Sequence, residues 1–125
     1  MEKQLQSAVL RVMNVLWDRG EATASQIAAE LGEKYRYSKT TTYTLIKRCI
    51  EKGAVGRVDP GFVCRPLLGR EEVQRNGLNE LLDKLYGGRA DRLVAAVLER
   101  EDISPEEAAR LRELVRRWSD GTDAS

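Results

Sequence analysis

Histidine is absent from the 125-residue sequence. A histidine-based catalytic triad, a histidine metal ligand and an unperturbed imidazole pH switch are therefore excluded. There are two cysteines, Cys49 and Cys64, which are 15 positions apart and form no CxxC motif, so we expect neither a zinc site nor a disulfide. We interpret both as small buried apolar residues, and we predict no metal and no cofactor.

Long apolar segments are also lacking. No run of 18 apolar residues is present, and the N-terminus has no apolar stretch typical of a signal peptide. We therefore expect a soluble, cytoplasmic protein. A glycine-rich phosphate loop and a paired-carboxylate cleft are missing as well, so an enzyme is the class that the sequence favours least.

The net charge is only +1, but it is unevenly distributed. Residues 1–68 contain 11 Lys/Arg and 7 Asp/Glu, whereas residues 69–125 contain 10 and 13. Between Lys34 and Arg57 there are seven basic residues and a single acidic one, Glu51. A basic segment in an otherwise neutral chain indicates a localised contact with nucleic acid.

Residues 38–52 predict a helix at the centre of this basic segment. Ser38 is a suitable N-cap, and Gly53 can supply the left-handed residue that ends the helix. At about 100° per residue, one face is apolar and the opposite face is polar. The apolar face contains Thr42, Leu45, Ile46 and Cys49, and the polar face contains Thr40, Tyr43, Thr44 and Lys47.

The polar face of this helix suits hydrogen bonding to base edges and phosphates. It offers hydroxyls, a phenol and an ammonium group, and it has no carboxylate before Glu51. The alternative is a merely solvated face. Residues 40–42 are three consecutive threonines, which are poor helix formers, and a solvated face would more often carry Glu, Lys and Gln. We therefore favour DNA recognition by this helix.

Two helices are predicted before it. Apolar residues recur at three- and four-residue spacing from about Lys3 to Arg19. Thr23 and Gln26 have the spacing of a capping box, which opens a short helix ended by Gly32. A tight connection then leads to the central helix. This order is typical of a helix-turn-helix, in which the last helix lies in the major groove.

A β-hairpin is predicted next. Two short extended segments, 54–58 and 62–66, flank the turn signal Asp59-Pro60-Gly61. The hairpin would be the wing of a winged helix, from which Arg57 could reach a phosphate or serve solubility alone. The expected fold class is therefore mainly α with a small β-hairpin, and we assign residues 1–68 to an N-terminal winged helix-turn-helix domain.

From residue 69 the sequence is charged, leucine-rich and helical in pattern. Three amphipathic helices are predicted, the first ended by Gly87-Gly88 and the third opened by Ser104-Pro105. They can enclose little apolar surface alone, so they must pack on the first domain or on a second copy, and a two-fold dimer would also read two half-sites. We assign residues 69–118 to a helical dimerisation region and 119–125 to a disordered tail. The expected dimerisation residues are Leu78, Leu81, Leu82, Leu85, Leu93, Val97, Leu111, Leu114 and Trp118.

Motifs in order along the chain resemble those of the penicillinase-repressor family (BlaI/MecI type) of winged-helix transcriptional regulators. Those before the central helix are Val15-Leu16-Trp17 and Gly20-Glu-Ala-Thr23. Those of the recognition helix are Tyr37-Ser38, Thr40-Thr41, Thr44-Leu45, Lys47-Arg48 and Glu51-Lys-Gly53. Those of the C-terminal region are Arg65-Pro-Leu, Arg70-Glu-Glu72, Leu82-Asp-Lys-Leu-Tyr-Gly-Gly88, Leu93-Val-Ala-Ala, Leu98-Glu and Ile103-Ser-Pro-Glu-Glu107.

This resemblance implies a homodimeric repressor that binds a palindromic operator of the TACA…TGTA type. It also implies a membrane-bound metallopeptidase sensor that acts when a β-lactam arrives and causes the repressor to be cleaved in its dimerisation region. DNA contacts would fall on Thr40, Thr41, Tyr43 and Thr44, with Lys47 and Arg48 nearby. With the basic segment and the helix cap included, the candidate DNA-binding residues are Arg36, Ser38, Lys39, Thr40, Thr41, Tyr43, Thr44, Lys47, Arg48 and Arg57.

The chain departs from the family pattern at three places. The wing has Pro60, Phe62 and Cys64 where the family frequently has Arg-x-Tyr-x-Tyr. Ala96-Val97 stands where the best-known members have the cleaved Asn-Phe peptide. The C-terminal cysteine pair of the copper-responsive branch is missing, so copper sensing is not expected.

Two alternatives stay open beside a DNA-binding repressor. One is a winged-helix regulator that releases DNA when a small molecule binds in the dimer cleft, and the other is a winged helix that serves only as a protein-interaction module. Proteolysis would leave fragments, whereas ligand release would leave the chain intact. Loss of salt-dependent DNA binding would favour the interaction module.

Overall fold

The computed structural model describes residues 7–124, and the chain forms two compact units, Met1–Glu80 and Leu81–Ser125. The division falls within helix α4 (Arg70–Leu85), whereas the sequence ended the winged helix at residue 68. Among the described residues, no helix is both long and apolar enough to cross a membrane.

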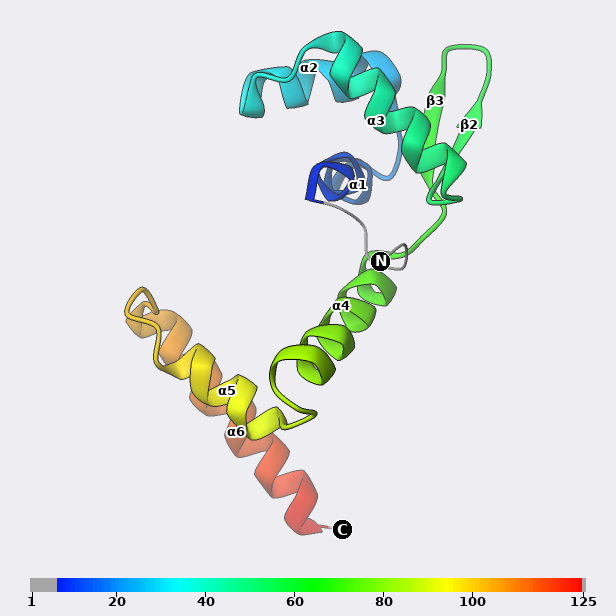
Figure 1. Ribbon diagram of the computed structural model, residues 1–125. Coiled ribbons are helices and arrows are strands. Elements are labelled where there is room, and N and C mark those ends of the chain that lie inside the picture. Colours follow the sequence, from blue (N-terminus) through cyan, green and yellow to red (C-terminus); the bar gives the residue numbers. More distant parts are fainter. Residues whose placement is uncertain (1–6, 125) are drawn as a thin grey trace. The chain divides into compact units, whose positions relative to one another are not determined.

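The first unit is a winged helix, as the sequence predicted (Figure 1). Its three strands form an antiparallel sheet in the order β1-β3-β2. The hairpin register places Val58 opposite Val63, and Ala22 of β1 lies opposite Cys64. The elements are α1 (Ser7–Arg19), β1 (Ala22–Thr23), α2 (Ala24–Tyr35), α3 (Lys39–Glu51), β2 (Val55–Val58) and β3 (Val63–Pro66).

The core of this unit lies where the apolar faces of the three helices meet the sheet. The α1 stripe is buried between Val9 and Leu16, and the predicted start of this helix at Lys3 lies outside the described residues. All four residues assigned to the apolar face of α3 are buried. Each fully buried Leu, Ile, Val or Met side chain contributes about 1.5–3 kcal/mol, so this core is the main source of stability for the unit. The cluster contains Val9, Val12, Met13, Val15, Leu16, Ala22, Ala24, Ile27, Leu31, Leu45, Ile46, Cys49, Ala54, Val55 and Cys64.

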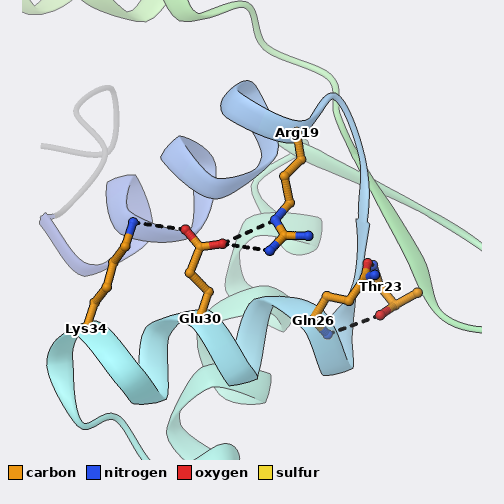
Figure 2. Close-up of polar contacts among 5 residues, drawn as sticks. All are labelled: Arg19, Thr23, Gln26, Glu30 and Lys34. Atoms are coloured by element: carbon orange, nitrogen blue, oxygen red, sulfur yellow. Dashed lines mark hydrogen bonds and ion pairs between the residues drawn. The ribbon is translucent and has the colours of Figure 1, made fainter.

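Helix α2 begins as predicted but ends later. The Thr23 hydroxyl accepts from the Gln26 N–H at 3.1 Å, and the Gln26 side chain accepts from the Thr23 N–H at 2.9 Å, which completes the capping box (Figure 2). The expected end at Gly32 is wrong, because the helix continues to Tyr35 and Arg36 adopts the left-handed cap conformation at φ 61°. A Cβ on Gly32 would lie 3.4 Å from the Tyr37 carbonyl oxygen, at the limit of ordinary van der Waals contact, so this glycine lies inside α2 and close to the turn that follows the helix.

Helix α3 has the ends that the sequence predicted. The Ser38 side chain accepts from the Thr41 N–H at 3.0 Å. Gly53 follows the helix with φ 78°, a conformation that costs glycine little. Because the cap and the buried face are both local to this segment, they fix where the helix starts and which face points outward.

The second unit contains the end of α4, α5 (Ala90–Leu98) and α6 (Pro105–Ala124). The Gly88 N–H bonds to the Leu82 carbonyl at 2.9 Å, as expected at a glycine-ended helix. The Ser104 hydroxyl accepts from the Glu107 N–H at 3.1 Å and caps α6. The segment expected as a disordered tail, 119–125, continues α6 up to Ala124, and the Arg116–Asp120 ion pair at 3.0 Å spans the predicted end.

Candidate nucleic-acid interface

The polar face of α3 lines an open depression of about 440 Å³. Four of its five lining residues are exposed, and Tyr43 is half-buried. The lining offers hydroxyl and ammonium donors and contains no carboxylate. It is formed by Lys39, Thr40, Tyr43, Thr44 and Lys47. This chemistry suits acceptors on bases and phosphates.

The turn before α3 is tied to α1 by a cluster of one arginine and two tyrosines. Arg11 donates to the Tyr37 hydroxyl at 2.7 Å, and its guanidinium carbon lies 4.0 Å from the centre of the Tyr35 ring. The two tyrosine rings are 5.7 Å apart. The sequence did not predict this cluster, because Arg11 lies 26 positions from Tyr37 and no local period connects them.

The wing is tied to α3 by a second cluster. The Tyr43 and Phe62 rings meet edge to face, with centroids 5.8 Å apart and planes 82° apart. The Arg57 guanidinium carbon lies 3.6 Å from the centre of the Phe62 ring, and its Nε is 3.1 Å from an Asp59 carboxylate oxygen. The sequence placed Phe62 in an extended segment and as a departure from the family pattern, and neither observation predicts its contact with Tyr43.

The candidate DNA-binding residues fall into two groups. Five of them line the α3 depression. The others lie elsewhere: Ser38 and Thr41 form the helix cap, Arg36 occupies the left-handed turn position, Arg48 is exposed outside the depression, and Arg57 pairs with Asp59.

Both cysteines are fully buried and free, in agreement with their predicted role as small apolar residues. Burial raises the pKa of the Cys49 thiol to about 11, and the neighbouring Cys64 adds to the shift. Burial also raises the pKa of Cys64. Neutral thiols are poor nucleophiles and poor metal ligands, so the chemistry of this unit lies in its exposed donors.

The predicted dimerisation residues lie on helices without a buried core. None of the side chains whose exposure is described in α4, α5 and α6 is buried. Six of the nine candidates are exposed, among them Leu85 at 72%, Leu114 at 59% and Trp118 at 71%. Within the second unit, α6 and the end of α5 form a groove of about 680 Å³ whose apolar lining includes Leu98, Ile103, Ala108, Leu111 and Val115.

Known proteins with related sequences include a resistance regulatory protein and a repressor. The methicillin resistance regulatory protein MecI of Mammaliicoccus sciuri is 29% identical over 90% of this chain and 93% of its own length. The penicillinase repressor of Bacillus licheniformis is 27% identical over 90% of this chain and 89% of its own.

Solved structures resemble more than half of the chain. The DNA-binding domain of the repressor BlaI in solution has a TM-score of 0.52 and 28% identity, with 58% of this chain and 90% of that chain covered. Monomeric Bacillus licheniformis BlaI in complex with the blaP half-operator has a TM-score of 0.50 and 30% identity, with 55% and 87% covered. A family model described as penicillinase repressor matches residues 7–117. The chain therefore belongs to the penicillinase repressor family.

Proposed function

We propose that this protein is a sequence-specific DNA-binding repressor that acts as a homodimer on a palindromic operator. The observation that carries the proposal is the carboxylate-free depression on α3, which gathers hydroxyl and ammonium donors on one exposed helix face. The relative that was solved on its half-operator supports the same use of the winged helix.

The residues of the depression divide by chemistry. Thr40, Tyr43 and Thr44 carry hydroxyls on short or rigid side chains, which suit hydrogen bonds to base edges. Lys39 and Lys47 carry mobile ammonium groups, which suit phosphates and give no sequence preference. Arg57 is a weaker candidate than the sequence suggested, because a phosphate would have to compete with Asp59 for its guanidinium.

The homodimer is supported by the exposed apolar stripes of the second unit. Trp118 and Leu85 are each more than two-thirds exposed, and a soluble single chain rarely leaves so many large apolar side chains in water. A second copy would cover them. It would also supply the second reading head that a palindromic operator requires.

Derepression by cleavage in the dimerisation region is the mode that the family suggests. Ala96 and Val97 lie within α5, so a cut there would separate Leu93 from Leu111 and Leu114 of α6 in the chain. A membrane-bound metallopeptidase sensor that responds to a β-lactam or cell-wall signal would act indirectly, with no stable attachment of the repressor to the membrane.

A second candidate is release of DNA on binding of a small molecule. The α5–α6 groove favours it, because its volume of about 680 Å³ lies in the range of ligand pockets. Electrophoresis of the induced protein separates the two modes. Fragments would support cleavage, and an intact chain that has left the DNA would support a ligand.

The test of DNA binding is a titration of the purified protein with promoter fragments that it retains from its own genome and with random duplexes, over a series of salt concentrations. Thr44→Ala should lower operator affinity by about 1–3 kcal/mol and leave random binding nearly unchanged. Lys47→Ala should weaken both alike and reduce the salt slope by about one unit. Lys52→Ala, at the C-cap of the same helix and outside the depression, is the matched control for a lost charge.

Three outcomes would contradict the proposal. An affinity that does not fall as the salt concentration rises would show that phosphate contacts do not contribute to binding. If Thr44→Ala lowers the affinity for operator and random duplexes equally, Thr44 makes no specific contact with a base. Complete absence of duplex binding by the intact protein would favour a protein-interaction module.

A further inference from the structure

Phe62 has a backbone conformation that non-glycine residues seldom adopt. Its φ is 51°, in the left-handed region, where a side chain is normally unfavourable. Two hydrogen bonds keep the residue there. Its N–H donates to an Asp59 carboxylate oxygen at 3.3 Å, and its carbonyl accepts from the Ala24 N–H at 3.0 Å. The wing turn is thus joined to the first residue of α2.

The Phe62 ring is held as firmly as its backbone. The Arg57 guanidinium lies over it at 3.6 Å, and Asp59 pairs with that same guanidinium. The ring then meets Tyr43 of α3 edge to face at 5.8 Å, the arrangement in which aromatic quadrupoles attract. Asp59 therefore fixes Phe62 twice, once through its N–H and once through Arg57, and Phe62 in turn contacts the DNA-reading helix.

Among the residues that line the α3 depression, Tyr43 is the one whose side-chain orientation depends most on neighbouring residues. It is half-buried and packs at the edge of the core, and its hydroxyl stands at the end of a rigid ring with two side-chain torsions. A ring fixed at one edge restricts the positions open to that hydroxyl. Thr40 and Thr44 need no such support, because their hydroxyls are attached directly to Cβ on the helix.

We propose that Phe62 is a positioning residue for DNA recognition, which fixes the direction of Tyr43 on the reading face through edge-to-face contact and does not itself contact DNA. The proposal rests on the proposed function. In this proposal the wing contributes to sequence discrimination indirectly, because it contacts the recognition helix. It does not need to contact a phosphate itself. A strained residue held by several independent contacts is a common sign of such a role.

The first test uses Phe62→Leu in the full-length protein, titrated with the retained operator and with a random duplex. The ratio of operator to random affinity should fall about threefold to tenfold, the range expected for loss of an aromatic pair. The salt slope should not change, because no phosphate contact is lost. Phe62→Tyr keeps the ring and should retain the ratio of the unmodified protein.

A double-mutant cycle separates the route through Tyr43 from the route through Arg57. Phe62→Leu should have no further effect on the ratio when Tyr43→Leu is already present. It should still lower the ratio when Arg57→Gln is present, because the backbone hydrogen bonds of Phe62 and its contact with Tyr43 remain. The proposal would be overturned if the effects of Phe62→Leu and Tyr43→Leu on the affinity ratio were additive. It would also be overturned if the effect of Phe62→Leu disappeared only in the Arg57→Gln background.

A measurement on the unmodified protein covers the case in which the variants fold poorly. Proton NMR of the operator complex should show Overhauser contacts between the Tyr43 and Phe62 rings. Their absence in the complex would overturn the proposal, whatever the variants do. If the intact protein binds its operator but both Phe62→Leu and Phe62→Met keep the discrimination ratio, this inference fails alone. If no salt-dependent duplex binding exists, the proposed function fails first.

Discussion

The indole N–H of Trp17 donates a hydrogen bond to the backbone carbonyl oxygen of Leu68 at 2.8 Å. This contact joins the end of α1 to the segment that leaves the sheet after β3. Arg70 supports it, because its guanidinium carbon lies 5.5 Å from the Trp17 ring centre and its terminal nitrogen is 2.7 Å from an Asp18 carboxylate oxygen. The exit from the wing is therefore anchored to the first helix, within the same unit.

Trp17→Phe tests this anchor. It removes the donor, leaves the Leu68 carbonyl without its partner and reduces the packed ring area, so the free energy of unfolding should fall by about 1–3 kcal/mol. Arg70→Gln removes an ion pair whose side chains are both at least 40% exposed, and it should cost less than about 1 kcal/mol. Denaturant titrations of both variants give the comparison. Equal losses would show that the indole hydrogen bond contributes little.

The recognition helix could be predicted from the sequence because its determinants are local. Ser38 and Gly53 lie at its two ends, and the 100° periodicity between them separates Leu45 and Cys49 from Thr40 and Lys47. No long-range contact is needed for either feature. The cap, the buried face and the exposed polar face were therefore all predicted, and the structure confirms the first two directly.

Features that depend on distant partners could not be predicted. Strand β1 is two residues long and has no period of its own, so only its pairing with β3 defines it. The contacts of Arg11 with Tyr37 and of Tyr43 with Phe62 join residues 26 and 19 positions apart. The helix end expected at Gly32 was wrong for a different reason, because a glycine also occurs inside a helix and α2 continues past it to Tyr35.

Ser38→Ala tests the cap of the recognition helix. The Thr41 N–H loses its acceptor, so the free energy of unfolding should fall by about 1 kcal/mol. Thr41→Ala is the matched variant, since it keeps the Ser38 acceptor and removes the hydroxyl contact between the two side chains at 2.9 Å together with one methyl group of an exposed residue. Thermal unfolding should rank Ser38→Ala as the less stable variant. The reverse order would assign the cap to Thr41.

Thr42→Val tests a polar atom inside the core. The Thr42 side chain is fully buried, and its hydroxyl has no hydrogen-bond partner among the described residues. A methyl group of similar size removes this unsatisfied hydroxyl, so the variant should be more stable by about 1 kcal/mol. Thr44→Val, on the exposed face, should change stability by less than about 0.5 kcal/mol. A loss of stability in Thr42→Val would indicate that the hydroxyl is satisfied in solution.

Glu30→Gln tests an ion pair between α1 and α2. A Glu30 carboxylate oxygen lies 3.0 Å from Lys34 Nζ, and the other lies 3.1 Å from an Arg19 nitrogen (Figure 2). The hydrogen bond from Lys34 lowers the pKa of Glu30 below 4.5; burial opposes the shift, and Arg19 adds to it. Because the folded pKa is depressed, the stabilisation is present above pH 4.5 and is lost as the pH falls through the folded pKa.

The variant should therefore be less stable than the unmodified protein at neutral pH, by up to about 1 kcal/mol, and equally stable in acid. Denaturant titrations at a series of pH values measure this convergence. Glu33→Gln makes the same charge change on the same helix at a residue with no ion pair among those described, so its curve should follow the unmodified protein. A pH-independent difference for Glu30→Gln would exclude the carboxylate as its cause.

Leu114→Asp tests whether the dimer and the operator affinity are coupled. Leu114 is 59% exposed on α6, beside Leu111 and Trp118 of the same apolar stripe. If a second copy covers this stripe, an aspartate there would cost several kcal/mol unless the charge reaches water. The winged helix has a core of its own, so most of the helical circular dichroism should remain. A monomer occupies one half-site and loses the effective concentration of two linked reading heads, so operator affinity should fall by orders of magnitude.

Ala109→Asp is the matched control, because it places the same charge on α6 at an exposed position almost opposite Leu111 and Trp118 on the helix. It should remain dimeric and bind the operator normally. Sedimentation and operator titration on the same samples decide between the possibilities. A Leu114→Asp protein that still sediments as a dimer would place the interface elsewhere. A monomer that binds the operator at full strength would uncouple dimerisation from repression, and cleavage near Ala96 would then no longer explain release from DNA.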